Sequence, residues 1–224
     1  MAEWARTGSV DPVAVALLPQ WLAEVARVVP TMTVTDLNRF GTPHGEGRHS
    51  AVLVLFSDDR DLLLIRRATT MRSHAGQPAF PGGGVDDGDA DARAAALREA
   101  EEETGLDPAG VVLFGSLPDL WVPVTGYVVT PILGWWRDPS PVRVQDSDEV
   151  ASVHRVPIAD LVNPANRCLV LHPSGYVGPG FEVDGMIIWG FTGGIISGLL
   201  DRLGWALPWD QSRLVPLPPA TPDP

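Results

Sequence analysis

The sequence predicts a mixed α/β sandwich built around one hydrophobic core. Short apolar runs typical of buried strands are interspersed with helical patterns, without the strict strand–helix–strand rhythm of a parallel α/β fold. The chain has 224 residues, of which 45% are hydrophobic. That is enough for one large domain with a substantial core, and the chain shows no internal repeat.

The individual elements follow from apolar spacing and turn signals. Valines and leucines at helical spacing predict a first helix, which Pro19 starts or kinks. Ala, Leu, Arg and Glu fill a central helix, with Asp89 or Asp91 as its N-cap and Gly105 as its stop. The predicted helices are 13–28, 92–103, 158–162 and 187–203, and the predicted strands are 50–57, 62–66, 111–117, 127–132, 150–156, 168–171 and 181–183.

These elements predict three parts of the chain. A helical extension covers residues 1–30, a single domain covers 31–206, and a Pro-rich tail over 207–224 is expected to be disordered. The last apolar stretch, 187–203, allows two roles, a cap on the core or a contact in a homodimer.

Charge and cysteine content exclude several classes of protein. The net charge of −12 argues against nucleic acid as the main partner, because phosphate backbones require a basic surface. The single cysteine, Cys168, rules out an internal disulfide framework and fits a cytoplasmic protein. We see no signal peptide, and the apolar stretch 186–200 is short for a membrane span, so no membrane partner is expected.

The central helix carries a cluster of carboxylates. Glu99, Glu102 and Glu103 fall near one face, because helix neighbours are three and four residues apart. Mg²⁺ or Mn²⁺ would offset the repulsion of such like charges, since both prefer carboxylate oxygens. A solvated acidic helix face is the alternative reading of the same charges.

The segment 83–106 resembles the signature box of the Nudix hydrolases. That box runs Gly, five residues, Glu, seven residues, then Arg-Glu-apolar-x-Glu-Glu-x-Gly-apolar, and residues 98–106 (REAEEETGL) match its second half. The first half departs, because five residues separate Gly83 from Asp89, but eight residues rather than seven separate Asp89 from Arg98. The first acidic position is therefore either shortened and shifted to Asp89, or lost.

The segment 63–83 resembles the additional motif of the coenzyme A pyrophosphatase branch of that family. The motif reads Leu-Leu-x-x-Arg-Ser/Ala, three residues, Arg, three residues, Gly, three residues, Phe-Pro-Gly-Gly, and every fixed position matches. The resemblance implies a Nudix-type mixed-sheet α/β/α sandwich and metal-dependent cleavage of coenzyme A or acyl-CoA into 3′,5′-ADP and 4′-phosphopantetheine. Two alternatives are a Nudix hydrolase for another nucleoside diphosphate derivative, such as NADH or ADP-ribose, and a Nudix-fold binding module without catalysis.

The resemblance also implies the site residues. Arg67 and Arg72 could contact phosphate oxygens through planar guanidinium groups, or form ordinary ion pairs. Arg98 is expected to pair with a carboxylate of the box and orient it. The expected catalytic residues are Arg98, Glu99, Glu102 and Glu103, the expected substrate contacts are Arg67, Arg72, Gly76, Phe80, Gly82 and Gly83, and the expected metal contacts are Glu99, Glu102, Glu103, Glu149 and the carbonyl of Gly83.

Overall fold

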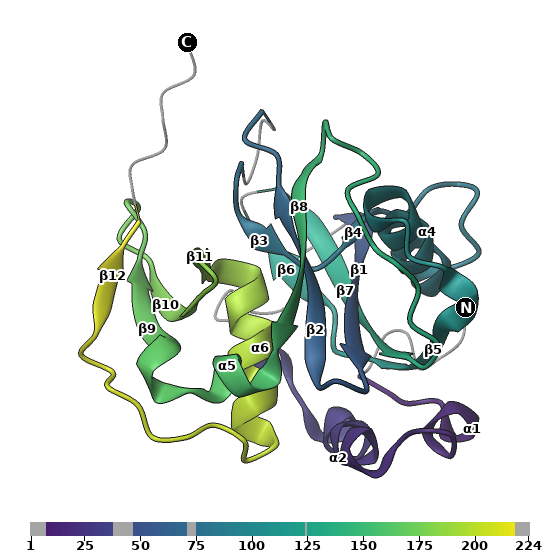
Figure 1. The fold of residues 1–224 in the computed structure, drawn as a ribbon, viewed down its shortest axis with the longest axis horizontal. Helices are drawn as coiled ribbons and strands as arrows, with labels where there is room; N and C mark the ends of the chain where they lie inside the picture. Colours follow the sequence, from purple (N-terminus) through teal and green to yellow (C-terminus); the bar gives the residue numbers. More distant parts are fainter. Residues whose placement is uncertain (1–7, 38–46, 71–74, 124, 218–224) are drawn as a thin grey trace.

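The computed structural model describes residues 8–37, 47–70, 75–123 and 125–217 (Figure 1). These residues form a large mixed sheet and a smaller sheet, and helices pack against them. The large sheet contains β1 (Arg48–Ser57), β2 (Asp61–Arg67), β3 (Pro78–Ala79), β4 (Gly82–Gly84), β5 (Val111–Ser116), β6 (Leu120–Val122), β7 (Tyr127–Trp136) and β8 (Val150–Pro157). The smaller sheet contains β9 (Arg167–Leu171), β10 (Val177–Val183), β11 (Met186–Ile188) and β12 (Leu214–Pro216).

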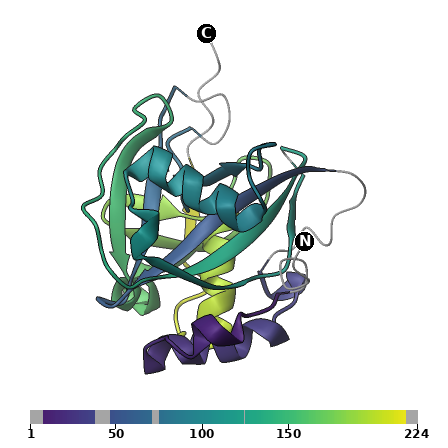
Figure 2. The same ribbon diagram turned by 90° about the vertical axis from the view of Figure 1, so that its right-hand side faces the viewer.

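Helices flank the large sheet on both sides. The helices are α1 (Pro12–Val15), α2 (Gln20–Val28), α3 (Val34–Leu37), α4 (Ala92–Thr104), α5 (Ile158–Val162) and α6 (Gly190–Arg202), and the short 3₁₀ turns are η2 (Val29–Thr31), η3 (Pro108–Gly110) and η4 (Pro164–Asn166). Figure 1 shows α4 on one side of the sheet and α6 on the other, and Figure 2 shows α4 lying across the sheet. The predicted mixed-sheet α/β/α sandwich is confirmed.

The large sheet has a hydrophobic core on each face, and not the single core that the sequence predicts, because successive side chains of strand β1 point to opposite faces. Ala51, Leu53 and Leu55 pack beneath α4. Val54 and Phe56 enter the larger core with residues of α2 and α6. Alternate residues of the central strand therefore hold helices on both faces of the sheet.

Helix α4 lies close to the sheet because its inward residues are alanines. Ala95, Ala96 and Ala100 have no exposed surface, and they pack with the β1 residues named above. Asp91 caps the start of α4 by accepting hydrogen bonds from two backbone N–H groups. Gly105 ends the helix in the left-handed conformation at φ 69°. Both ends lie where the sequence predicts them.

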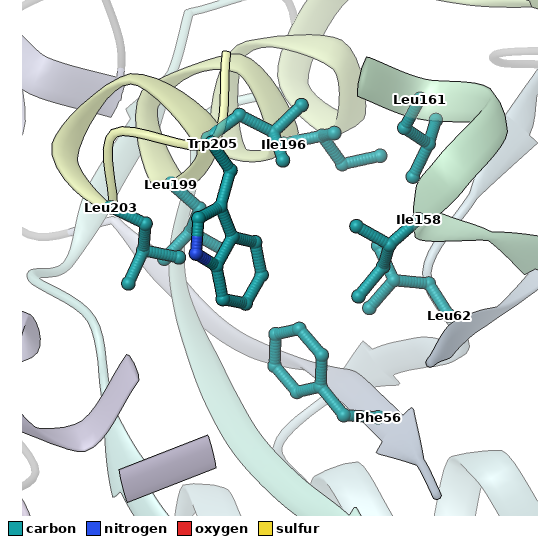
Figure 3. A pocket seen from close by; sticks show the side chains of 9 residues that line it. Phe56, Leu62, Ile158, Leu161, Ile196, Leu199, Leu203 and Trp205 are labelled. Carbon is teal, nitrogen blue, oxygen red and sulfur yellow. The ribbon is translucent and has the colours of Figure 1, made fainter. Parts of the chain in front are cut away.

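The larger core joins the two sheets. Figure 3 shows apolar side chains from α5, α6 and the β1–β2 hairpin facing one another. They line a cavity of about 10 Å³. Its lining residues are Phe56, Leu62, Ile158, Leu161, Ile196, Leu199, Leu200, Leu203 and Trp205. Because this cavity is apolar and of roughly one water's volume, it belongs to the packing and not to a ligand site.

Two predicted helices differ from the observed ones at their ends. Pro19 is the N-cap residue of α2, so the prediction that it starts a helix is confirmed, whereas the upstream part of the predicted helix forms the separate α1. Residues 186–188, where the sequence predicts the start of the last helix, form β11, and α6 begins at Gly190. The β-branched pair Ile187–Ile188 fits a strand as well as a helix, and pairing with β10 decides between them.

The described part of the predicted disordered tail, 207–217, is instead packed on the smaller sheet. Strand β12 runs parallel to β9. The ring of Trp209 lies 4.9 Å from the guanidinium carbon of Arg167, and Arg213 forms an ion pair with Glu182. The predicted boundaries at residues 30 and 206 stay predictions. No helix in the described ranges has the length and apolar character needed to cross a membrane.

Candidate active site

The site is built on the bend at Pro81 and the first two residues of β4, Gly82 and Gly83, which are called the glycine turn below and where a side chain would clash. Gly82 has φ 155°, and a Cβ there would lie 2.2 Å from the carbonyl oxygen of Ala51 on the neighbouring strand β1. A Cβ on Gly83 would lie 2.4 Å from the carboxyl carbon of Glu99. The two glycines therefore allow the backbone of β4 to pack against β1 and leave space for the carboxylates of α4.

Glu103 is the buried carboxylate of the site, with 2% of its surface exposed. Its Oε2 atom accepts a hydrogen bond of 2.9 Å from the backbone N–H of Gly82, whereas its buried Oε1 atom has no partner. Burial raises the pKa of Glu103 to about 8, which the Gly82 hydrogen bond and the charge of Arg67 oppose. Burial therefore favours the protonated form of Glu103 in the metal-free protein.

Arg98 ties the other acidic groups together. Its Nη1 atom donates to Glu99 Oε1 at 2.9 Å and to Glu102 Oε2 at 3.0 Å, and its Nη2 atom donates to the carbonyl oxygen of Gly84 at 3.0 Å. The sequence prediction that Arg98 pairs with a carboxylate of the box is confirmed. One guanidinium thus orients two carboxylates toward the glycine turn.

Asp89 receives the remaining two hydrogen bonds of Arg98. The Nε and Nη2 atoms of Arg98 donate to the two carboxylate oxygens of Asp89 at 3.0 and 2.9 Å. These hydrogen bonds lower the pKa of Asp89. The shorter side chain, one residue out of register with the Nudix box, therefore still reaches the arginine, and the acidic position is shifted and not lost.

Three further acidic groups differ in exposure. The side chain of Glu99 is 16% exposed, and burial raises its pKa although Arg98 lies against it. The side chain of Glu102 is 58% exposed. Glu149, at the start of β8, is exposed, and its charge raises the pKa values of both Glu99 and Glu103. Glu103 and Glu99 therefore lie against Gly82 and Gly83, Glu149 is close enough for its charge to act on both, and Glu102 is linked to Glu99 through Arg98.

The oxygen atoms of the site are of the type that binds a hard divalent cation, although the described side chains do not form a complete ligand cluster. In the described ranges, no three His, Cys, Asp or Glu side chains stand at metal-binding spacing. Arg98 holds Glu99 and Glu102, which are two of the expected ligands. The unpartnered buried oxygen of Glu103, however, is the kind of atom that a cation would satisfy, and carboxylate and carbonyl oxygens are the ligands that Mg²⁺ and Mn²⁺ prefer.

The residues upstream of the turn are brought to the same end of the sheet. Arg67 lies near enough to Glu103 for its charge to lower the pKa of that carboxyl. Gly76, at φ 69°, donates its N–H to the carbonyl oxygen of Arg67 and so closes the loop between them. Phe80 is 2% exposed and packs in the larger core, so its side chain supports the turn and does not face a ligand. Arg72 lies outside the described residues.

One polar cluster near this end was not found from the sequence. Ser152 and His154 lie on β8, and Ser152 Oγ is 2.7 Å from His154 Nε2. Their spacing of two residues puts both side chains on one face of a strand. The two-residue spacing is the only signal for this cluster in the sequence. It becomes informative only when β2 is known to be the strand beside β8.

Comparisons with known proteins identify the family of this chain. The NUDIX domain model matches residues 47–172. The "Uncharacterized Nudix hydrolase NudL" of Cronobacter sakazakii is 38% identical over 196 residues, covering 84% of this chain and 95% of that protein. The protein of the same name from Escherichia coli K12 is 40% identical over 166 residues, covering 70% of this chain and 83% of that protein.

A solved structure of a MutT/nudix family protein from Enterococcus faecalis is 14% identical and aligns with a TM-score of 0.48, over 84% of this chain and 75% of that one. The assignment rests on the NUDIX model, which covers more than half of the chain, and on the two relatives. The chain belongs to the Nudix hydrolase family.

Proposed function

We propose that this Nudix hydrolase cleaves the diphosphate linkage of coenzyme A or an acyl-CoA, giving 3′,5′-ADP and 4′-phosphopantetheine or its acylated form. The observation that carries the diphosphate chemistry is the buried, unpartnered Oε1 atom of Glu103 beside the Gly82–Gly83 turn. The preference for coenzyme A rests on the arginine-containing motif over 63–83, which resembles the coenzyme A pyrophosphatase branch.

Mg²⁺ or Mn²⁺ is the proposed cofactor. Glu99, Glu102, Glu103 and the carbonyl of Gly83 are its proposed ligands, with Glu149 as a further one. Bound there, the cation would neutralise charge on the diphosphate oxygens and lower the pKa of a bound water.

The chain's own residues would then position the substrate and the carboxylates. Arg98 keeps Glu99 and Glu102 facing the turn through the hydrogen bonds described above. Arg67, whose charge already acts on Glu103, is the proposed contact to a diphosphate oxygen, because a guanidinium binds such oxygens in a two-pronged manner. Arg72 is proposed for a second phosphate contact on the motif alone. One of the carboxylates would accept the proton of the attacking water.

The test is hydrolysis of coenzyme A, NADH and ADP-ribose with Mg²⁺ or Mn²⁺, compared with EDTA and with the Glu103→Gln variant. Cleavage of coenzyme A that requires a cation and is lost in the variant supports the proposal. Cleavage of NADH or ADP-ribose without cleavage of coenzyme A would assign another nucleoside diphosphate derivative as substrate. No cleavage of any of them would favour a binding module, and full activity in the variant would overturn the assignment of the site. Glu101→Gln, on the exposed side of α4, is the matched control.

A further inference from the structure

A second polar cluster lies on the face of the large sheet that is turned away from α4. In the antiparallel pairing of β2 with β8, His154 lies opposite Leu64, and Leu64 packs in the larger core. Ser152 lies opposite Arg66 in the same register. Because paired residues share a face of the sheet, the side chains of Arg66, Ser152 and His154 belong to one group on this face.

The guanidinium of Arg66 has N–H groups that donate no hydrogen bond within the described residues. Its side chain is exposed, and its Nε atom donates to the carbonyl oxygen of Gly76 at 3.2 Å. No carboxylate in the described part of the chain forms an ion pair with it. The Nη1 and Nη2 atoms are therefore available to an anion, with the hydroxyl of Ser152 opposite on the neighbouring strand.

His154 adds a group whose charge a bound anion would change. Burial lowers the pKa of His154, the charge of Asp184 on the β10–β11 turn opposes that effect, and the charge of Arg66 adds to it. The free protein therefore favours a neutral imidazole, with Ser152 at hydrogen-bonding distance. A phosphate dianion at this place would favour the charged imidazole and provide acceptors for all three side chains.

This cluster and the carboxylate site meet at the end of β2. Arg66 belongs to the cluster, whereas the next residue, Arg67, acts on Glu103. The pairing with β8 shifts between these two arginines, from Arg66 opposite Ser152 to Arg67 opposite Val150. Arg66 and Arg67 are the last two residues of β2 and present their side chains on opposite faces of the sheet, so a nucleotide that passes the end of this strand could contact both arginines.

We propose that Arg66, Ser152 and His154 form a phosphomonoester site, which binds the 3′-phosphate on the ribose of a coenzyme A-type substrate while its diphosphate lies at the carboxylates. This inference rests on the proposed function and extends it. It explains how the chain would select a substrate with a third phosphate over NADH and ADP-ribose, which lack that group.

The kinetic test compares kcat/KM for coenzyme A and for 3′-dephospho-coenzyme A. The native protein should prefer coenzyme A about 10-fold or more, since hydrogen bonds to a charged group contribute about 1.5–3 kcal/mol. Arg66→Ala and Ser152→Ala should each reduce that preference several-fold. Arg27→Ala, which removes an exposed arginine of α2, should leave it unchanged. An equal proportional loss for both substrates, or an unchanged preference in both variants, would overturn the inference.

A binding experiment separates failure of this inference from failure of the proposed function. Isothermal titration calorimetry measures the dissociation constants of 3′,5′-ADP and 5′-AMP, two ligands that differ by the 3′-phosphate and require no hydrolysis. If the protein cleaves no coenzyme A but binds 3′,5′-ADP about 10-fold more tightly than 5′-AMP, and Arg66→Ala removes the difference, the phosphomonoester site stands without the proposed activity. Equal affinity of the native protein for both ligands would refute the site.

Discussion

Replacing Glu103 by glutamine should stabilise the metal-free protein by an amount that grows as the pH rises from 5 to 8. The same substitution should remove the proposed activity. The pKa of Glu103 is raised from 4.5 to about 8, mainly by burial. Above pH 4.5 the unfolded chain releases this proton, whereas the folded chain retains it until the pH approaches 8. The folded state thus binds more protons than the unfolded state, and the free energy of unfolding falls as the pH rises through this window.

The magnitude follows from the size of the shift. Each unit of pKa corresponds to about 1.4 kcal/mol, and integrating the linkage between pH 5 and pH 8 gives a loss of about 3 kcal/mol from this group alone. Glutamine has no proton to release and can still accept the hydrogen bond from Gly82. The variant should therefore gain about 3 kcal/mol relative to the native protein over that interval.

The assay is urea unfolding in EDTA at pH 5, 6, 7 and 8, followed by circular dichroism. Glu101→Gln removes the same formal charge from an exposed position of α4, and its difference from the native protein should stay nearly constant with pH. Added Mg²⁺ should stabilise the native protein more than the Glu103 variant, because a ligand of the folded state shifts the unfolding equilibrium by mass action. A stability difference for Glu103→Gln that does not change with pH would refute the reasoning.

Three further predictions concern packing and orientation. Gly82→Ala should destabilise the fold by about 3 kcal/mol or more, because its Cβ would clash with the backbone of β1. Gly84→Ala, whose Cβ would have no atom within 4 Å, should cost less than about 1 kcal/mol, and thermal unfolding of both variants checks this difference. Asp89→Asn should weaken the hold on Arg98 and lower kcat/KM about 10-fold, and an unchanged rate would show that the shifted acidic position plays no part. Leu161→Ala should enlarge the cavity of Figure 3 and reduce the free energy of unfolding by about 2–5 kcal/mol in urea titrations, and a loss below about 1 kcal/mol would contradict the packing there.

The sequence predicted those parts of the fold that local rules determine. The ends of α4 follow from Asp91 and Gly105, and the β1–β2 hairpin follows from apolar runs separated by an acidic turn. What it missed depends on partners far away in the chain. Strand β12 could not be predicted within the Pro-rich tail, because it forms by pairing with the distant strand β9. The cluster at Ser152 and His154 could not be recognised either, because it depends on the pairing that places Arg66 opposite Ser152.

The burial of Glu103 argues against one of the two interpretations that the sequence left open for the acidic helix, a solvated acidic face. A solvated acidic face would leave each glutamate in water, as Glu101 and Glu102 are. Glu103 instead has 2% of its surface exposed and one oxygen without a partner, and the charges of Glu99 and Glu149 raise its pKa further. Burying the Glu103 carboxyl lowers the folding stability of the metal-free chain. Packing alone does not explain this burial, because a neutral residue would fill the same space with a smaller loss of stability. The cost is offset once a positive charge lies among these carboxylates, so the burial of Glu103 favours a cation site over a solvated surface.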